Sequence, residues 1–451
     1  MAAGSSVAKA VKSSNVLKQP QLNIKGIIAN QHLYRDSIIR RQLPPQTLND
    51  LEFIVENRAK QLEFQNQLDA LRRKRSELGA LMKSQRSPDL ISQLSQIKTQ
   101  IKPLETSCDN LQQEIFEKAE SLPNLLHETV PQDPEAGDIV EFINCTSETR
   151  AEELMPKLSF DHKDIGEKLN IMNFETASRI SGSSWYYLTG DGALLEQALV
   201  QYGLFKARQH GYKMVIPPSM VRSEVINACG FKPKDQNDEK QIYQIADEQV
   251  CLTGTAEIPL GALHSSSTFE PGTQFPIKYV GVSRAYRAEA GARGRDTKGL
   301  YRVHEFTKVE LFHFSKPEEA CEELEQLKNL QVEIIKELGI SAKMINMPSN
   351  DLGAPALKKY DCEAWMPGRG NWGELTSCSN CGDFQSRRLG IKYRDSESNS
   401  VHVHTLNGTC MAVPRVIVAI IEQNYDPETE SVKIPQVLIP YMDGKDRIYK
   451  N

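Results

Sequence analysis

The sequence predicts an α+β protein in two parts: an antiparallel hairpin of two long helices, then a larger domain with an antiparallel sheet flanked by helices. Two observations predict this arrangement. Apolar residues repeat at heptad spacing between about residues 51 and 119. Beyond about residue 161, strand-like runs and amphipathic segments follow one another without βαβ spacing, which favours antiparallel strands.

Length and composition narrow the class of protein. The 451 residues suffice for two or three domains, and 39% hydrophobic with 25% charged residues is ordinary for a soluble protein. No apolar run approaches the ~20 residues of a membrane helix. The net charge of -5 argues against a wholly basic surface for nucleic acid, but not against a local one. Nine scattered cysteines suit free thiols in a reducing compartment.

The first 20 residues are expected to be a separate segment. No Asp or Glu precedes Asp36, whereas lysines and serines are frequent. This composition is typical of an organelle transit peptide, and a disordered tail is the alternative. We therefore expect a transit or disordered segment over 1–20, an N-terminal domain over 21–130 and a catalytic domain over 131–451.

The hairpin of about 51–119 is predicted most clearly by its second arm. There, apolar residues alternate at spacings of three and four: Leu94, Ile97, Ile101, Leu104, Cys108, Leu111 and Ile115. The first arm keeps the phase but is interrupted by Arg75. Ser87 and Pro88 form a helix-start signal between the arms, whereas Pro103 should kink the second arm or leave a carbonyl unpaired.

Basic residues lie on the outer face of the hairpin, at Arg72, Arg73, Arg75, Lys83 and Arg86. A charged helix face is most often simply solvated. The alternative is a surface that follows the phosphates of a nucleic acid.

Common nucleotide and metal motifs are missing. The sequence has no P-loop, no Rossmann glycine pattern in a strand–helix context and no HExxH. Cys378 and Cys381 form one CxxC without a second pair, so no structural zinc is expected.

The stretch RAEAGARGRDTKGLYRVHEF, residues 287–306, concentrates basic residues. Two strands joined by a loop would bring Arg287 and Arg302 together, and paired guanidinium groups suit a polyphosphate. Phe306 could stack on a flat ring, and Glu289 could accept a hydrogen bond from an exocyclic amine. These parts describe an ATP site; the alternative is a surface hairpin with ion pairs worth under ~1 kcal/mol each.

Two later segments fit the same site. Glu374 and Ser377 in GELTSCSN offer the hard oxygen ligands that Mg²⁺ takes beside phosphates. Arg415 stands at the start of an apolar helix, where a buried guanidinium requires an anionic partner.

Together these segments resemble motifs 2 and 3 of class II aminoacyl-tRNA synthetases, with YKMVIPPSMV as motif 1, and the seryl-tRNA synthetases match best. The resemblance runs from about residue 20 onward and includes the helical arm, TAEIPL at Thr255–Leu260, and HTLNGT. The segments SWYYLTGDGALLEQAL and TLNGTCMAVPR are most similar in sequence to fungal mitochondrial members.

The resemblance implies ATP-dependent ligation of L-serine to tRNA(Ser), with Mg²⁺, by a homodimer without membrane segments, in the mitochondrial matrix or alternatively the cytoplasm. It implies catalytic roles for Arg287, Arg302 and Arg415. It implies ATP contacts for Arg287, Ala288, Glu289, Arg302, Val303, His304, Glu305, Phe306, Glu374, Leu375, Thr376, Ser377 and Arg415. It implies that serine binds to Thr255, Ala256, Glu257, Arg287, Glu310, Asn407 and Thr409. It implies that Mg²⁺ binds to Glu374 and Ser377, and that tRNA binds to Arg72, Arg73, Arg75, Lys83 and Arg86. The dimer interface is expected at Pro217 or Pro218.

The sequence departs from the family pattern at Pro414, where glycine is usual, and at Lys298, where arginine is common. Three rival interpretations stay open at this point: an inactive relative that binds RNA or a partner through the helical arm, a class II synthetase for another amino acid, and a structural coiled-coil protein. The third explains residues 51–119 and nothing after them.

Overall fold

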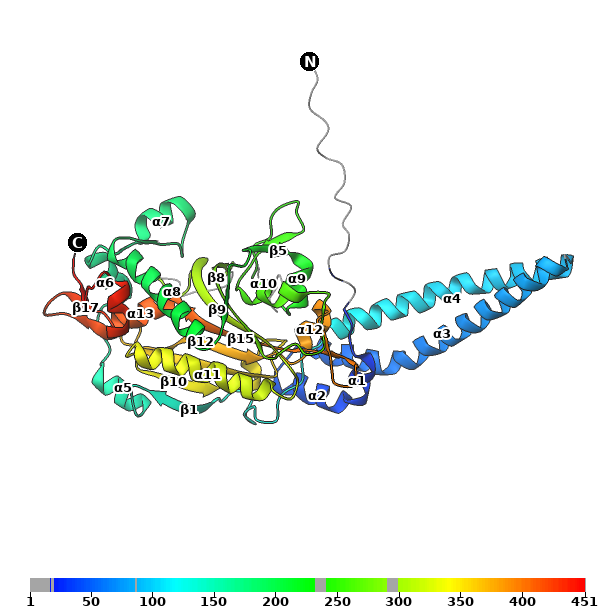
Figure 1. The fold of residues 1–451 in the computed structure, drawn as a ribbon, viewed down its shortest axis with the longest axis horizontal. Helices are drawn as coiled ribbons and strands as arrows, with labels where there is room; N and C mark the ends of the chain where they lie inside the picture. Colours follow the sequence, from blue (N-terminus) through cyan, green and yellow to red (C-terminus); the bar gives the residue numbers. More distant parts are fainter. Residues whose placement is uncertain (1–16, 18–19, 86, 232–240, 290–298, 451) are drawn as a thin grey trace, which may run out of the picture. The chain divides into compact units, whose positions relative to one another are not determined.

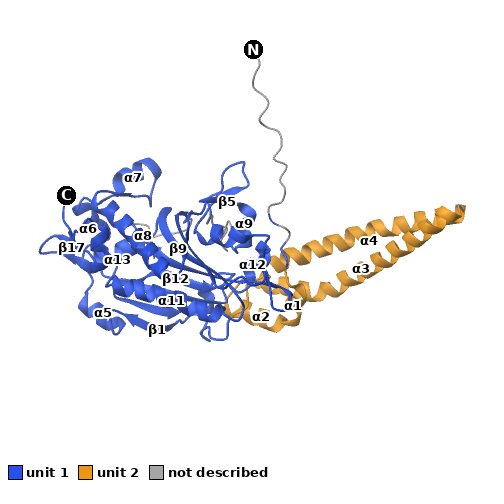
Figure 2. Ribbon diagram, in the orientation of Figure 1, with its two compact units in different colours: residues 1–21, 127–451 blue, residues 22–126 orange. Residues whose placement is uncertain are grey.

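The computed structural model describes residues 17, 20–85, 87–231, 241–289 and 299–450 (Figure 1). The chain forms two compact units, Leu22–Leu126 and a larger one of Met1–Gln21 with His127–Asn451 (Figure 2). Within the described ranges, no helix combines the length of a membrane span with the hydrophobicity that one needs.

The smaller unit is helical. Its elements are α1 (Ile24–Ala29), α2 (Gln31–Arg40), α3 (Pro45–Ser84) and α4 (Pro88–Ser121). The long helices α3 and α4 are the predicted hairpin, and their seam is confirmed: Leu68 packs with Ile97, Ile101 and Cys108 in one buried cluster.

The predicted turn of the hairpin is also confirmed. Pro88 is the first residue of α4, and the Ser87 side chain accepts a hydrogen bond from the Asp89 backbone N–H. Helix α4 runs on through Pro103, which has no N–H to donate to the carbonyl of Thr99. Both residues are exposed, so water can take the place of that donor.

An eight-stranded sheet forms the centre of the larger unit. In spatial order its strands are β1 (Asp138–Ile143), β10 (Ala342–Asn346), β11 (Lys358–Met366), β12 (Asn371–Asn380), β15 (His404–Ala412), β9 (Glu305–Ser315), β8 (Ile277–Tyr286) and β4 (Lys213–Val215). Neighbours are antiparallel except β4 and β8, so the predicted antiparallel sheet is confirmed with one parallel edge.

Shorter elements surround this sheet. The α-helices are α5 (Glu148–Leu154), α6 (His162–Lys168), α7 (Phe174–Ser181), α8 (Asp191–Gln209), α9 (Ser223–Ala228), α10 (Glu257–Gly261), α11 (Ala320–Glu337), α12 (Phe384–Leu389) and α13 (Val413–Asn424). The 3₁₀ turns are η1 (Ala262–His264), η3 (Ser349–Asp351) and η4 (Gln436–Tyr441). The small strands are β2 (Met172–Asn173), β3 (Tyr187–Leu188), β5 (Met220–Arg222), β6 (Val250–Leu252), β7 (Thr268–Phe269), β13 (Lys392–Arg394), β14 (Ser400–His402), β16 (Tyr425–Asp426), β17 (Ser431–Lys433) and β18 (Arg447–Ile448).

The two faces of the sheet have different roles. Buried residues of α8, α11 and α13 share one core cluster with Val309 and Leu311 of β9. Because side chains alternate along a strand, Lys308 and Glu310 face the other way. That second face carries the polar residues of the site described next.

Candidate active site

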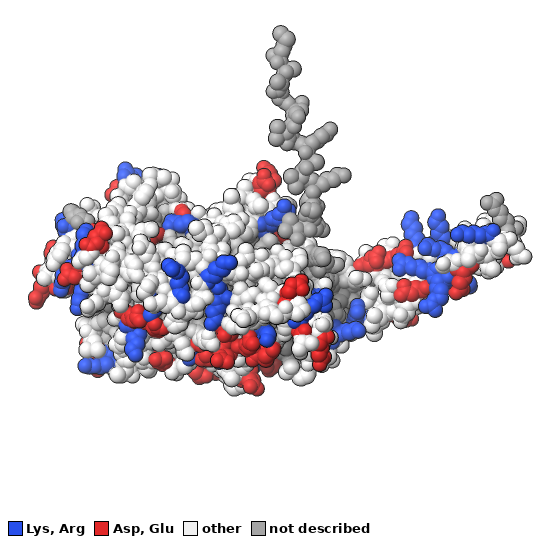
Figure 3. All heavy atoms as spheres, viewed as in Figure 1, with Lys and Arg blue, Asp and Glu red and all other residues white. Residues whose placement is uncertain are grey.

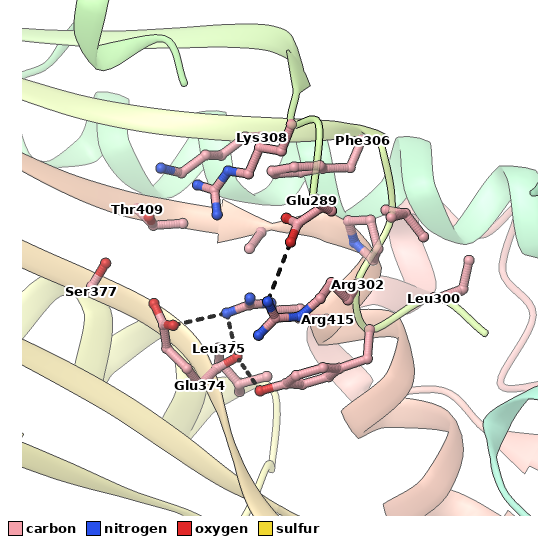
Figure 4. Close-up of a pocket in the computed structure, with 15 residues that line it drawn as sticks. Glu289, Leu300, Arg302, Phe306, Lys308, Glu374, Leu375, Ser377, Thr409 and Arg415 are labelled. Atoms are coloured by element: carbon pink, nitrogen blue, oxygen red, sulfur yellow. Dashed lines mark hydrogen bonds and ion pairs between the residues drawn. The ribbon is translucent and has the colours of Figure 1, made fainter. Parts of the chain in front are cut away.

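A pocket lies where β8, β9, β12, β15 and the start of α13 meet. Figure 4 shows its lining, which includes Glu289, Leu300, Arg302, Phe306, Lys308, Glu374, Leu375, Ser377, Thr409 and Arg415. Arg287, Tyr301, Val303, Ala412 and Pro414 complete it. Residues more than 100 positions apart in the chain therefore meet in one cavity.

The ends of the stretch 287–306 come together as predicted. Beyond the β8–β9 pairing, the Arg287 N–H still donates to the His304 carbonyl at 2.9 Å. The Arg287 guanidinium carbon lies 5.3 Å from the centre of the Phe306 ring. Arg302 Nη1 lies 3.3 Å from Glu289 Oε2, so the two predicted ATP residues form an ion pair.

Glu289 has a backbone φ of +46°, in the left-handed region that non-glycine residues rarely adopt. Such conformations persist where the surrounding structure holds them, and they cluster at functional sites. Here the conformation accompanies a side chain that points into the pocket (Figure 4).

Two β-bulges set which side chains face the pocket. In β12 the register against β11 shifts at Leu375, and in β15 the register against β9 shifts at Cys410. Residues three apart on a regular strand point to opposite faces, but a bulge between them restores the same face. Glu374 therefore joins Ser377 in lining the pocket, and Thr409 joins Ala412.

Arg415 and Glu374 form a charge pair in the pocket. Arg415 Nη1 donates to the Glu374 carboxylate at 3.0 Å and to its backbone carbonyl at 3.2 Å. Burial alone would raise the pKa of Glu374, but Arg415, Lys359 and Arg287 outweigh it and hold that pKa below its usual range. Glu374 is thus ionised at neutral pH.

The arginines crowd one another. Burial, and next the positive charge of Arg415, lower the pKa of Arg287. Like charges held together in a pocket favour an anionic ligand, which would relieve their repulsion.

Lys308 extends the polar site toward the predicted serine residues. Its Nζ lies 2.6 Å from Glu310 Oε2 and 3.1 Å from Thr255 Oγ1, and all three residues are buried. Thr409 pairs opposite Glu310 across β15 and β9.

Glu257 is held by two amides. Its Oε1 accepts from Gln385 Nε2 at 2.7 Å and from Asn407 Nδ2 at 2.9 Å. Burial, followed by the nearby charge of Glu310, raises the pKa of Glu257 to about 7. A buried carboxylate with this pKa suits a cationic ligand, whose charge would favour the ionised form. Ala256 caps the short helix that Glu257 begins.

Other predicted ATP residues do not line the pocket. The Ala288 N–H donates to the Gln241 carbonyl at 3.1 Å. The side chain of His304 meets the hydroxyl of Tyr243, that of Glu305 pairs with Arg284 on the opposite face of β9, and Thr376 is buried on β12. Lys298 and Arg86 lie outside the described residues.

Sequence reasoning missed several residues of this region, among them Lys308, Tyr301 and Gln385. Lys308 precedes Glu310 by two positions on a predicted strand, so the strand period could have placed both on one face. Tyr301, whose ring centre lies 4.8 Å from the Arg415 guanidinium carbon, adjoins Arg302 in sequence. Gln385 carried no local signal, because only the tertiary fold brings it to Glu257.

The predicted tRNA residues of the smaller unit are exposed. Arg72, Arg73, Arg75 and Lys83 all lie on the surface of α3, and Arg72 pairs with Glu105 of α4 at 2.8 Å. Figure 3 shows basic side chains gathered along the hairpin with acidic ones among them.

Apolar side chains are exposed around the predicted motif 1. Ile216 is 90% exposed, and Met214 and Met220 are about half exposed. The expected interface residues Pro217 and Pro218 lie between them.

Comparisons with known proteins agree with this geometry. Residues 22–126 match the family model of the seryl-tRNA synthetase N-terminal domain, and residues 241–424 match the class II tRNA synthetase core domain (G, H, P, S and T). The chain is 46% identical to the mitochondrial serine–tRNA ligase of Saccharomyces cerevisiae over 95% of this chain and 96% of that protein. It is 36% identical to the mitochondrial ligase of Schizosaccharomyces pombe, over 96% and 90%.

Among solved structures, the seryl-tRNA synthetase from Pyrococcus horikoshii complexed with ATP superposes with a TM-score of 0.86, at 33% identity and covering 95% of this chain and 100% of that one. The match of residues 241–424 to the synthetase core excludes a merely structural coiled coil, and the match of the N-terminal unit separates the chain from class II synthetases for other amino acids. The hairpin, the antiparallel sheet and these relatives together show that the chain belongs to the seryl-tRNA synthetases, the class II enzymes that act as serine–tRNA ligases.

Proposed function

We propose that this chain activates L-serine with ATP and transfers it to the 3′ end of tRNA(Ser) in mitochondrial translation. The observation that carries the proposal is the convergence of Arg287, Arg302, Arg415 and Glu374 in one pocket. The mitochondrial role is supported by the two yeast relatives that are named mitochondrial, and by the acid-free N-terminus.

In the ATP part of the pocket, the three arginines divide the triphosphate between them. Arg287 holds the α-phosphate, and Arg302 with Arg415 binds the γ-phosphate. Phe306 stacks on the adenine, and Glu289 accepts a hydrogen bond from its amino group. When ATP binds, Arg302 would exchange its contact with Glu289 for phosphate oxygens.

The residues on β12 fit a magnesium ion. Glu374 and Ser377 offer oxygen donors on one face of the strand, and Glu374 is ionised because of its arginine neighbours. Mg²⁺ bound there would neutralise charge on the phosphates. In the described ranges, no group of three or more His, Cys, Asp and Glu side chains is placed to hold a metal, so phosphate oxygens and water would complete the coordination.

In the serine part, Glu257 and Thr255 receive the ammonium group. Glu310, Asn407 and Thr409 line the space for the hydroxymethyl side chain and the carboxylate. A site whose buried polar groups bond a substrate hydroxyl rejects alanine strongly, because those groups would be left unpaired.

The chemistry needs little covalent work from the protein. A serine carboxylate oxygen attacks the α-phosphorus, the bond to pyrophosphate breaks, and seryl-adenylate forms. A hydroxyl of the terminal tRNA ribose then attacks the seryl carbonyl carbon, and AMP leaves with the bonding electron pair. Arg287, Arg302 and Arg415 position the phosphates and stabilise the charge that develops on them.

The smaller unit is suited to binding tRNA, and the larger unit carries the proposed dimer interface. Exposed arginines of α3 suit the phosphate backbone of an RNA helix, which proteins read by shape and backbone contacts. The exposed apolar residues around Ile216 suit the interface with a second copy of the chain, since such residues are favoured at dimer interfaces.

The test is pyrophosphate exchange into ATP with each amino acid in turn, followed by charging of mitochondrial and cytosolic tRNA pools. We expect exchange with serine alone and preferential charging of mitochondrial tRNA(Ser). A folded preparation without serine-dependent exchange would indicate an inactive relative, and preference for cytosolic tRNA would overturn the mitochondrial role.

A further inference from the structure

A single imidazole connects helix α13 to the segment that forms one wall of the pocket. His162 is buried at the start of α6. Its Nδ1 lies 2.7 Å from Glu422 Oε1, and its Nε2 lies 3.0 Å from the backbone nitrogen of Leu300. A backbone N–H can only donate, so Nε2 carries the lone pair and Nδ1 donates its proton to Glu422.

Glu422 holds this imidazole firmly. It lies on α13, seven residues or about two turns after Arg415. Its Oε1 also accepts from the His162 backbone N–H at 3.2 Å, and its Oε2 accepts from the Gly368 N–H at 2.8 Å. Both carboxylate oxygens are therefore occupied, and the ring has one tautomer and one orientation.

The backbone beside Leu300 is shaped for this contact. Gly299 has a φ of +83°, and a Cβ at this position would lie 2.2 Å from His162 Nε2. Only glycine combines that conformation with so close an approach. The next residues, Leu300 and Tyr301, line the pocket, and the Tyr301 ring lies against Arg415.

We infer that His162 is a positioning residue for ATP binding. By fixing the Leu300 backbone to α13, it keeps Tyr301 beside Arg415. His162 itself does not line the pocket. The inference rests on the proposed assignment of this pocket to ATP, and it implies that ATP rather than serine responds to changes at His162, because the serine residues lie on other elements.

Two amide substitutions separate the two hydrogen bonds of the imidazole. His162→Asn keeps a donor near Glu422 but places no acceptor at the Leu300 N–H, whereas the longer side chain of His162→Gln reaches that N–H with its amide oxygen. In serine-dependent exchange, we expect His162→Asn to raise the KM for ATP about tenfold, with the KM for serine changed less than about twofold. His162→Gln should recover most of the loss.

Two further variants keep the test decisive. Gly299→Ala displaces the same backbone without altering the histidine and should also raise the KM for ATP. His313→Asn removes another buried histidine, which contacts Tyr212 and Glu323, and should lower the melting temperature without changing the KM for ATP.

The inference is overturned if His162→Asn and His162→Gln have equal KM values for ATP, or if the KM for serine rises as much as that for ATP. Exchange by the unsubstituted enzyme reports on the proposed function, and the ratio between variants reports on His162, so each can fail separately.

Discussion

Lys308 and Glu310 lie two residues apart on the same face of β9, and their side chains form a buried ion pair of 2.6 Å. Removing one partner leaves an uncompensated charge, which destabilises a protein by about 3–5 kcal/mol. We expect Lys308→Met to lower the free energy of unfolding in urea by an amount in that range. The Lys308→Met/Glu310→Gln double variant should recover much of this stability but not serine activation. Equal stabilities of the single and double variants would contradict this account of the pair.

The raised pKa of Glu257 predicts a pH dependence for serine. The ionised carboxylate is the form that binds an ammonium group, so protonation below pH 7 should weaken binding. We expect the KM for serine to rise about tenfold for each pH unit below that pKa, while the KM for ATP changes little. Glu257→Gln should raise the KM for serine above pH 7, where the wild-type carboxylate is ionised, and remove this dependence.

The same carboxyl also affects stability, with a definite sign. Between its ordinary pKa of 4.5 and its folded value of about 7, the folded protein holds a proton that the unfolded chain has released. The contribution of Glu257 to the free energy of unfolding therefore falls as pH rises through this window. Urea melts of the wild type and Glu257→Gln at several pH values would measure the difference.

Replacing Arg287 by alanine should abolish adenylate formation, because the positive charge proposed to hold the α-phosphate would be lost. We expect exchange to fall by about 10³-fold or more. Arg284→Ala is the matched control: it lies three residues earlier on β8 and pairs with Glu305 on the opposite face. If both substitutions reduced exchange equally, the face of the sheet on which each arginine side chain lies would not determine ATP binding.

Charge reversal at Arg72, Arg73 and Arg75 should weaken tRNA charging and leave exchange intact, since these residues are exposed on the hairpin. The effect should diminish at high salt, where phosphate contacts are screened. Reversal at Lys433 and Arg394, which are exposed on the larger unit, serves as the control. Loss of exchange in the hairpin variant would contradict the division between units.

Ile216→Asp should convert the proposed dimer to monomer, because it places a charge in the centre of the exposed apolar group. Light scattering after size-exclusion chromatography measures the change. Ile180, which is 67% exposed on α7, provides the control substitution Ile180→Asp. A monomeric wild-type protein, or a dimeric Ile216→Asp variant, would contradict the interface.

The parts of the fold that sequence reasoning predicted are those with local signals. The heptad seam and the Ser87–Pro88 helix start needed only nearby residues, and both are present. The edge strand β1 was missed because DIVEFI lacks a clear alternation and is mostly exposed, so its place depends on pairing with β10, about 200 residues later.

The site also combines features that have a local sequence signal with features that depend on residues far apart in the chain. The pairing of Arg287 with the 302–306 segment was predictable because the two are near in sequence. The contact between Gln385 and Glu257 and the link from His162 to Leu300 span more than 100 residues, and no local pattern indicates them. Backbone details such as the left-handed Glu289 also depend on the assembled neighbours.

The bulges at Leu375 and Cys410 have a consequence for how the sequence of this enzyme can change. Replacing either residue alters packing at one buried position. Inserting a residue beside Leu375 would instead put an odd number of paired steps between Glu374 and Ser377, so that the two side chains would point to opposite faces and could not share a ligand. At these two positions, the number of residues in the strand is under a stricter constraint than their chemical identity.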